Sequence, residues 1–324
     1  MPDPAARPTI LLTRKLPDAV ERRAARDYDA RLNGDDLALD PPALARAAEG
    51  CAGLLVCAVD KVGAETIGLL PDGVKIIATF SVGTDHIDLA AAKRRGIIVT
   101  NTPDVLTDAT ADIALLLMLA AARRAGEGER MIRANGWTGW TPTQLLGTHM
   151  TGKTLGIVGM GRIGQAVARR ARAFDMRVRY SNPKRLAPGE EDGAIFHPTV
   201  EDLLPHAEFL SVHCPLTPET RHLIDARRIA LLPKGAILVN TARGPVLDDA
   251  AVVAGLRSGQ IAAAGLDVYD GEPAVPPDYV ALDNVVLLPH LGSATTETRV
   301  AMGNRALDNL DAYFAGRSPA DRVA

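Results

Sequence analysis

Short apolar runs alternate with alanine-rich segments of helical spacing along most of the chain. Each apolar run has the length of a strand, and a helical stretch separates it from the next run. This order predicts parallel strands joined by crossover helices, so the fold class is α/β with doubly wound parallel sheets. The predicted strands are Thr9–Thr13, Gly53–Ala58, Lys75–Thr79, Ile97–Thr100, Leu155–Val158, Arg177–Tyr180, Phe209–His213, Ala236–Asn240, Ala262–Leu266 and Val285–Leu288.

The strands fall into two series, which predicts two domains. The breaker Asn101–Asp104 closes the first series, and a long apolar helix is predicted over Ala109–Arg124. A poorly periodic stretch, 130–148, leads into the second series. A helix from Thr295 to about Ala315 follows the second series, as expected if the second domain is inserted in the first. The predicted domains are 1–103 with 290–324, and 104–289.

The second series opens with a strand, a glycine-rich turn and a predicted helix over Arg162–Phe174. Gly159, Gly161 and Gly164 form the pattern G-x-G-x-x-G in this context, which predicts dinucleotide binding. The first glycine allows a tight turn, the second lets the backbone approach a pyrophosphate, and the third lets the helix pack on the strand. The helix N-terminus offers free N–H groups to the phosphates. The predicted contacts are Gly159, Gly161, Arg162, Ile163 and Gly164.

The end of the next strand indicates which dinucleotide binds. An NAD site usually has an acidic residue about 20 residues past the first glycine, and positions 179–185 contain none. Ser181 and Asn182 can donate hydrogen bonds to a phosphate, and Lys184 and Arg185 can neutralise its charge. The alternative is that these two cations only belong to a solvated loop. The sequence therefore favours NADPH over NADH as cofactor.

Composition is consistent with a cytoplasmic enzyme. The chain has 324 residues, of which 47% are hydrophobic, so it can bury two aliphatic cores. A net charge of −3 gives no basic field for nucleic acid or a membrane surface. The apolar stretch Ile113–Ala122 is too short to span a bilayer, and the N-terminus has no signal-peptide pattern. Cys51, Cys57 and Cys214 lack metal or disulfide spacing, and the seven histidines do not cluster like metal ligands.

The chain resembles the D-isomer-specific 2-hydroxyacid dehydrogenases over nearly its whole length, and within that family the glyoxylate/hydroxypyruvate reductases. The loop Gly136–Trp140 and the His-x-Gly-Ser-Ala ending carry the narrower resemblance. The resemblance implies a Rossmann domain inserted in a flavodoxin-like substrate domain. The motifs that carry it are Ser81–Asp88 (SVGTDHID), Asn101–Leu106 (NTPDVL) with Ala109–Asp112 (ATAD), Gly159–Gly164, His213–Thr217 (HCPLT), Val239–Gly244 (VNTARG), Gly265–Val268 (GLDV) with Glu272–Pro273, and Leu288–Thr295 (LPHLGSAT).

The resemblance implies three catalytic residues, and simple chemistry agrees with each. Arg243 would bind the planar carboxylate of a 2-oxoacid, which a guanidinium matches with two parallel hydrogen bonds. His290 would protonate the ketone oxygen as hydride reaches the carbon. Glu272 would hydrogen-bond the second ring nitrogen of His290, which orients the imidazole and stabilises its protonated form.

The resemblance also implies further contacts and an assembly. The backbone N–H groups of Val82 and Gly83 would hold the substrate's carboxylate, although an ordinary turn at a strand end remains the alternative. The family forms dimers through the region of the long helix and of Trp137 and Trp140, so a two-fold homodimer is expected. The implied cofactor contacts are Thr110, Cys214, Pro215, Thr241, Ala242, Asp267 and Gly292.

The expected function is NADPH-dependent reduction of glyoxylate, hydroxypyruvate or a similarly small 2-oxoacid to the D-2-hydroxyacid. D-lactate-type and phosphite-oxidising relatives keep the same pair of catalytic residues, a histidine and a glutamate, and stay open as alternatives. A formate dehydrogenase would be expected to lack the glutamate partner of the histidine, so the presence of Glu272 disfavours that alternative. A dinucleotide-sensing protein like the related transcriptional co-repressors is a further alternative, against which stands the lack of long basic or disordered extensions.

Overall fold

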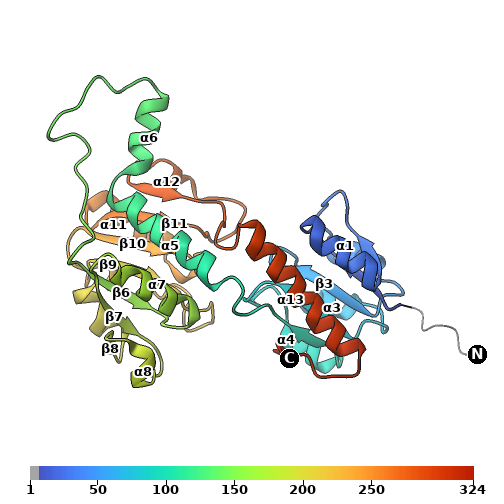
Figure 1. Ribbon diagram of the computed structural model, residues 1–324. Coiled ribbons are helices and arrows are strands. Elements are labelled where there is room, and N and C mark those ends of the chain that lie inside the picture. Colours follow the sequence, from blue (N-terminus) through green and yellow to red (C-terminus); the bar gives the residue numbers. More distant parts are fainter. Residues whose placement is uncertain (1–6) are drawn as a thin grey trace, which may run out of the picture. The chain divides into compact units, whose positions relative to one another are not determined.

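The protein is described by a computed structural model that covers residues 7–324. The chain forms two compact units (Figure 1). Unit 1 runs to Leu106 and resumes with Thr295–Ala324, and unit 2 is Thr107–Ala294. Each unit is an α/β layer structure around its own parallel sheet, as the alternating pattern predicts.

Unit 1 contains a five-stranded parallel sheet of order β2-β1-β3-β4-β5. Helices α1 (Asp18–Asp27) and α13 (Thr296–Phe314) pack on one face through a core that includes Val20 and Leu307. Three shorter helices cover the other face. The strands are β1 (Thr9–Leu12), β2 (Asp29–Leu32), β3 (Gly53–Cys57), β4 (Ile76–Phe80) and β5 (Ile98–Thr100), and the shorter helices are α2 (Pro41–Ala47), α3 (Ala64–Leu69) and α4 (Leu89–Arg94).

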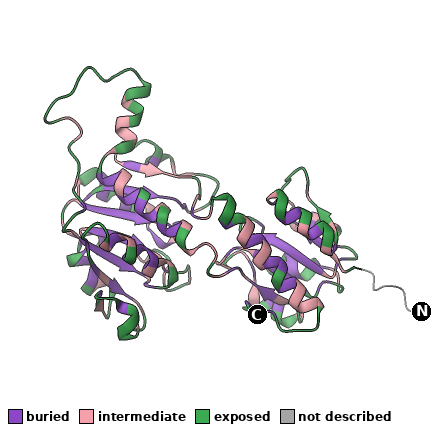
Figure 2. Cartoon of the chain, viewed as in Figure 1, coloured by how far each residue is buried: buried purple, intermediate pink, exposed green. Residues whose placement is uncertain are grey.

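Unit 2 contains a seven-stranded parallel sheet of order β12-β11-β10-β9-β6-β7-β8. This is the doubly wound order of a Rossmann domain with one added strand, so the predicted fold class is confirmed. Strands are buried between helices that expose their outer faces (Figure 2). The strands are β6 (Thr154–Val158), β7 (Arg177–Ser181), β8 (Ile195–His197), β9 (Phe209–Val212), β10 (Ala236–Asn240), β11 (Ile261–Leu266) and β12 (Val285–Leu287).

The helices of unit 2 cover both faces of its sheet. Helices α5 (Thr107–Ala122) and α7 (Arg162–Arg172) share one core, and α11 (Asp249–Ser258) packs in the core of the other face. The remaining elements are α6 (Ala125–Arg133), α8 (Pro188–Glu191), α9 (Val200–Leu203), α10 (Ala226–Ile229), α12 (Pro277–Val280) and two 3-10 turns, Leu204–His206 and Gly244–Val246.

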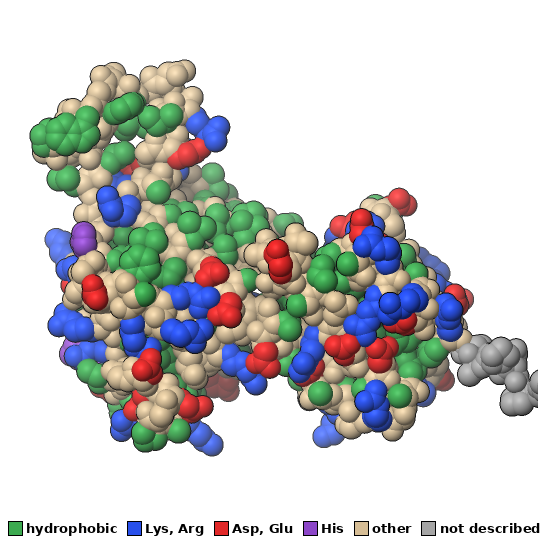
Figure 3. All heavy atoms as spheres, in the orientation of Figure 1, with side chains coloured by type: hydrophobic (Ala, Val, Ile, Leu, Met, Phe, Trp, Pro, Cys, Tyr) green, Lys and Arg blue, Asp and Glu red, His purple; other side chains and the backbone are tan. Residues whose placement is uncertain are grey.

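Helix α6 and the loop after it stand away from the sheet of unit 2 (Figure 1). No residue of α6 is buried, and the side chains of Trp137 and Trp140 are 52% and 77% exposed. Hydrophobic side chains gather on this segment in the space-filling view (Figure 3). The segment thus carries apolar surface that its own unit does not cover.

The sequence pattern does not predict strands β2 and β8 or helix α6. Strand β2 lies at the edge of its sheet and three of its four residues are exposed, so it lacks the apolar signal of a buried strand. Strand β8 has only three residues and is also an edge strand. Helix α6 begins before the poorly periodic stretch 130–148 and ends within it, and none of its residues is buried.

The boundaries of the units also differ from the expected breaks before residue 104 and residue 290. The second boundary lies after Ala294, so His290 belongs to unit 2. The reason is a set of hydrogen bonds: the backbone N–H groups of residues 290–292 donate to Asp267, which follows β11.

Candidate active site

Most of the predicted site residues of unit 2 lie at one edge of its sheet. All neighbouring strands run parallel, so the segments that follow their carboxyl ends meet at that edge, where α/β sheets bind ligands. The predicted residues in these segments are Gly159, Asn182, Cys214, Arg243, Asp267 and His290.

The three glycines after β6 have distinct steric surroundings. Gly159 has φ +95°, and a Cβ there would lie 2.5 Å from the backbone nitrogen of Cys214. A Cβ on Gly164 would lie 2.3 Å from the carbonyl oxygen of Gly159, so this glycine lets α7 approach the turn. A Cβ on Gly161 would meet nothing within 4 Å, and no side chain caps the helix that begins after it. Open space beside an uncapped helix N-terminus fits a dinucleotide pyrophosphate.

The residues after β7 differ in how far they are available to a ligand. Ser181 is buried, and its carbonyl oxygen accepts a hydrogen bond from the N–H of Gly159 at 3.1 Å. Asn182 Oδ1 accepts from the N–H of Met160 at 2.7 Å, so this side chain orders the glycine turn. Lys184 is exposed and makes no side-chain hydrogen bond or ion pair within residues 7–324. Among these positions Lys184 is therefore the most available cation.

Arg185 is engaged by a carboxylate that lies further along the chain. Its Nε and NH2 donate to the two oxygens of Glu191 at 2.8 and 3.0 Å, and the Tyr180 hydroxyl donates to the same carboxylate at 2.6 Å. Arg185, and then Tyr180, lower the pKa of Glu191 to about 2. The ion pair gives Arg185 a structural role that the sequence does not reveal, since the pairing depends on how the chain folds back after β7.

Glu272 and His290 form a hydrogen-bonded pair. His290 Nδ1 lies 2.8 Å from Glu272 Oε2, and the other carboxylate oxygen accepts the N–H of Tyr269 at 2.9 Å. Burial favours the neutral acid, but the hydrogen bonds from His290 and Tyr269 outweigh it, so the pKa of Glu272 lies below its ordinary value. The carboxylate is therefore ionised at neutral pH and can stabilise a protonated imidazole.

The loop that carries His290 is held by Asp267. His290 has φ +55°, a left-handed conformation that costs energy for a residue other than glycine. The two carboxylate oxygens of Asp267 accept the N–H groups of Leu291 and Gly292 at 2.6 and 2.8 Å, and its carbonyl accepts the N–H of His290 at 2.9 Å. The Thr110 hydroxyl donates to the carbonyl of Gly292 at 3.1 Å. These bonds fix the backbone on which the imidazole is mounted.

The sequence did not reveal this role of Asp267, to which the resemblance assigns a cofactor contact. The contact depends on β11 and β12 lying side by side, which places residues 24 and 25 positions apart within hydrogen-bond distance. A carboxylate has further lone pairs, so binding two loop amides leaves acceptor capacity for a ligand.

Arg243 follows β10 on a loop whose path is fixed by a close backbone approach. A Cβ on Gly244 would lie 1.9 Å from the carbonyl carbon of Tyr269, so only glycine allows this loop to pack against the segment that leads to Glu272. Asn240 binds the loop on both sides, accepting from the N–H of Ala242 and donating to the carbonyl of Arg243, each at 2.9 Å. The charge of Arg243 helps to lower the pKa of Glu272.

The segment after β9 adds groups that stay neutral. Burial lowers the pKa of His213 to about 4 and raises that of the Cys214 thiol to about 11. The imidazole of His213 lies 2.8 Å from the Ser211 hydroxyl and 3.3 Å from the Thr241 hydroxyl. Pro215 continues this segment. An uncharged wall is compatible with a nicotinamide ring, which the resemblance places here.

In unit 1, Val82 and Gly83 form the turn after β4. The carbonyl oxygen of Ser81 accepts the N–H of Thr102 at 2.9 Å, and that of Val82 accepts from Asn101 Nδ2 at 2.8 Å. In a trans peptide the C=O and the following N–H point in opposite directions. The N–H groups of Val82 and Gly83 are therefore directed away from residues 101 and 102.

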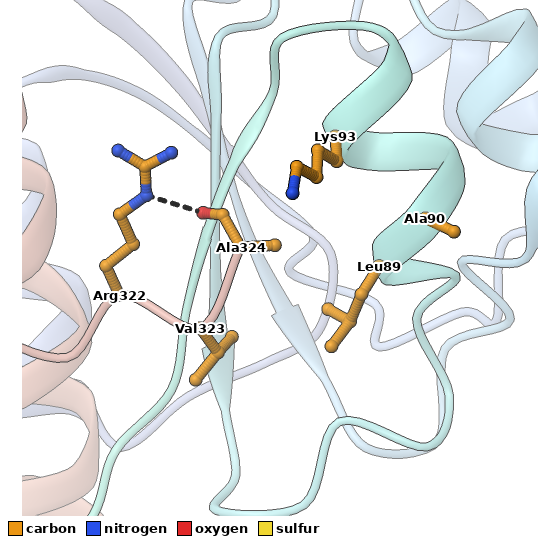
Figure 4. Close-up of a pocket in the computed structure, with 6 residues that line it drawn as sticks. All are labelled: Leu89, Ala90, Lys93, Arg322, Val323 and Ala324. Carbon is orange, nitrogen blue, oxygen red and sulfur yellow. Dashed lines mark hydrogen bonds between the residues drawn. The ribbon is translucent and has the colours of Figure 1, made fainter.

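A separate surface pocket in unit 1 contains none of the predicted site residues. It lies between α4 and the last residues of the sequence, where Arg322 Nε donates to the carbonyl of Ala324 at 2.9 Å (Figure 4). The cationic ends of Lys93 and Arg322 lie on opposite sides of the C-terminal residues, so they do not converge on a common ligand.

Across 7–324, no helix is both long and apolar enough to cross a membrane. Within the same part of the chain, no three His, Cys, Asp or Glu side chains are grouped so that they could hold a metal ion.

Comparison with known proteins agrees with the geometry of unit 2. The family model described as "D-isomer specific 2-hydroxyacid dehydrogenase, NAD binding domain" matches residues 115–292. The chain is 46% identical to a glycerate dehydrogenase from Hyphomicrobium methylovorum, over 95% of this chain and 96% of that protein. It is 42% identical to a glyoxylate reductase from Thermococcus litoralis, over 98% and 97% of the two chains.

Solved structures give the same result. A protein described as a putative D-isomer-specific 2-hydroxyacid dehydrogenase from Polaromonas sp. superposes with a TM-score of 0.93 at 44% identity, over 98% of this chain and 100% of that one. An NADPH-dependent glyoxylate/hydroxypyruvate reductase from Sinorhizobium meliloti, solved with NADP and malonate, superposes with a TM-score of 0.89 at 34% identity, covering 98% and 97%. The chain therefore belongs to the D-isomer-specific 2-hydroxyacid dehydrogenase family, where it groups with the glyoxylate reductases, and it is an NAD(P)-dependent dehydrogenase of 2-hydroxyacids.

Proposed function

We propose that the protein reduces glyoxylate, hydroxypyruvate or a similarly small 2-oxoacid to the D-2-hydroxyacid and prefers NADPH. The observation that carries the proposal is the 2.8 Å contact between His290 Nδ1 and the ionised carboxylate of Glu272. Such a pair keeps an acid available beside the carboxyl edge of the sheet, where the glycine turn fits the cofactor's pyrophosphate.

The proposed roles divide the chemistry among a few side chains. When bound, the dinucleotide supplies hydride to the carbonyl carbon of the substrate. His290 gives its proton to the carbonyl oxygen, and Glu272 holds the imidazole in place and balances its charge. Arg243 binds the substrate's carboxylate through its guanidinium, and the N–H groups of Val82 and Gly83 are further donors for that carboxylate.

The relatives support a small substrate. Those named above are a glycerate dehydrogenase and reductases of glyoxylate and hydroxypyruvate. Glycerate is the product of hydroxypyruvate reduction, so the names describe one type of reaction. The test is the rate of NADPH consumption with glyoxylate, hydroxypyruvate and pyruvate, and of NADP+ reduction with phosphite. Turnover with pyruvate or phosphite alone would favour the lactate-type or phosphite-type alternative, and no turnover at all would favour a cofactor-sensing protein.

The preference for NADPH is proposed from the absence of an acid after β7 and from the exposed Lys184. We expect Lys184→Ala to raise the KM for NADPH about 3- to 10-fold and to leave that for NADH nearly unchanged, because only the 2′-phosphate meets this charge. Arg185→Ala should in addition lower the melting temperature, since it removes the partner of Glu191. Steady-state kinetics with both cofactors and a thermal melt measure these effects. Equal losses with NADPH and NADH would show that the loop only supports the fold.

The pair of Glu272 and His290 gives a prediction about how the rate of reduction depends on pH. Glu272 has a lowered pKa, so its charge is present throughout the neutral range and is lost only as pH falls through that lowered value. Reduction uses protonated His290 and should slow as pH rises. We expect Glu272→Gln to move this decline toward lower pH, because the imidazolium loses its counter-charge while the shape is kept. Oxidation of the 2-hydroxyacid needs neutral His290 and should speed up as pH rises. A kcat/KM profile of Glu272→Gln from pH 5 to 9 that coincides with wild type would contradict the assignment.

We also propose that the protein is a homodimer with two-fold symmetry. The exposed apolar surface of α6 and its loop, including Ile132 (56% exposed), Trp137 and Trp140, is what a partner subunit would cover. We expect light scattering at working concentration to give twice the 34.2 kDa mass of one chain. A monomer mass would overturn this proposal.

A further inference from the structure

The turn after β4 is held by two side chains, those of Asn101 and Ser81. Besides the hydrogen bond from Asn101 to the carbonyl of Val82, the Ser81 hydroxyl donates to the carbonyl of Gly83 at 2.7 Å. Gly83 therefore sits between two peptide groups whose orientations are both fixed. Since glycine is the most flexible residue, this turn depends on its neighbours for a single conformation.

The Ser81 hydroxyl is itself part of a buried chain of hydrogen bonds. Thr79 Oγ1 lies 2.8 Å from Ser81 Oγ and 2.9 Å from His86 Nε2. Thr79 is fully buried and Ser81 is 6% exposed, so water does not readily replace these contacts.

The direction in which these hydrogen bonds are donated follows from the number of protons that each group carries. A carbonyl oxygen only accepts, so Ser81 uses its single hydroxyl proton on Gly83. Ser81 must then accept from Thr79, and Thr79, having used its own proton, must accept from His86 Nε2. The order of donation is His86 to Thr79 to Ser81 to the carbonyl of Gly83. One arrangement of the protons therefore makes all three of these hydrogen bonds at once, which favours a single conformation of the groups that they join.

We propose that Asn101 and the relay His86–Thr79–Ser81 are positioning groups that aim the N–H groups of the Val82–Gly83 turn at the substrate's carboxylate. Asn101 holds the peptide that contains the Gly83 N–H, and the relay holds the next peptide, so both peptides that flank Gly83 are restrained. Donors fixed before binding lose little freedom when they meet the carboxylate, which strengthens binding without touching the reacting atoms. The inference rests on the proposed role of the two N–H groups.

The test compares variants that remove or keep one hydroxyl. Thr79→Val keeps the branched shape and removes the hydroxyl, Thr79→Ser keeps the hydroxyl, and Asn101→Ala frees the carbonyl of Val82. Thr66→Val is a matched control, because Thr66 is also buried in unit 1 and its hydroxyl donates to the carbonyl of Lys61, outside the turn. For each full-length variant we would measure the KM for glyoxylate and NADPH, the kcat, the melting temperature, and the Kd of oxalate by calorimetry in the presence of NADP+.

We expect Thr79→Val and Asn101→Ala to raise the KM for glyoxylate and the Kd of oxalate about 3- to 10-fold, with the KM for NADPH within about twofold of wild type. Thr79→Ser should behave like wild type. Thr66→Val should lower the melting temperature without changing either substrate constant. If Thr79→Val and Asn101→Ala bind oxalate as wild type does, and change only the melting temperature, these groups serve stability alone and the inference is overturned.

The oxalate titration separates this result from a failure of the proposed function, because it needs no turnover. A wild type that binds oxalate but reduces no 2-oxoacid would refute the proposed reaction, and the variants would still decide the positioning role. A wild type that neither binds oxalate nor reduces a 2-oxoacid would overturn both.

Discussion

His290→Ala is expected to reduce kcat about 10²- to 10⁴-fold at every pH, which is the range that one positioned acid–base group contributes. The substitution removes the proton donor and no phosphate contact, so NADPH should bind with a Kd within about twofold of wild type. Steady-state reduction of glyoxylate measures the first effect, and titration of NADPH fluorescence measures the second.

A matched control distinguishes loss of chemistry from general damage. His149 is an exposed histidine of the same unit, and His149→Ala should keep wild-type kcat. If His290→Ala reduced the 2-oxoacid at a near-normal rate, another group would have to supply the proton and the proposed mechanism would be wrong. If it lost NADPH binding as well, the loop held by Asp267 would serve the cofactor rather than the proton transfer.

Arg243→Ala is expected to lower kcat/KM for the 2-oxoacid about 10²- to 10³-fold, because a carboxylate loses two charge-assisted hydrogen bonds and its counter-ion. Arg243→Lys should recover only part of this loss, since an ammonium keeps the charge but lacks the planar fork. The measurement is kcat/KM with glyoxylate for both variants.

The control for Arg243 is an arginine of the same unit outside the proposed site. Arg221 is exposed and forms an ion pair with Asp270 at 3.2 Å, so Arg221→Ala should change kcat/KM little. An Arg243→Lys enzyme as active as wild type would show that charge alone suffices, and it would contradict two-point recognition of the carboxylate.

The sequence predicted most of the buried strands correctly because their apolar runs are strong local signals. Strands such as Ala236–Asn240 are buried on both faces, so every position must be apolar or hydrogen-bonded within the fold. Edge strands carry no such requirement, which is why β2 and β8 were missed. The glycine turn was also predictable, because Gly159 and Gly164 meet backbone atoms too closely for any side chain.

Contacts between distant segments were not predictable from the residues alone. Lys184 and Arg185 are adjacent cations in the sequence, yet Arg185 is bound by Glu191 while Lys184 is exposed. Nothing local distinguishes the two, because the difference arises from how residues 186–191 fold back toward β7. The pairing of Glu272 with His290 likewise came from a family resemblance, and their contact depends on two loops that meet at the sheet edge.

By itself the sequence determined the two parallel-sheet domains, the dinucleotide turn and the kinds of side chain available for reduction, because apolar periodicity and glycine sterics act over a few residues. Tertiary structure alone decided that Asp267 holds the His290 loop, that Gly244 lets the Arg243 loop pack against the segment before Glu272, and that a relay from His86 reaches Gly83. The physical reason is that a hydrogen bond requires its two atoms within about 3 Å, and only the register of neighbouring strands and the course of their loops bring distant residues so close.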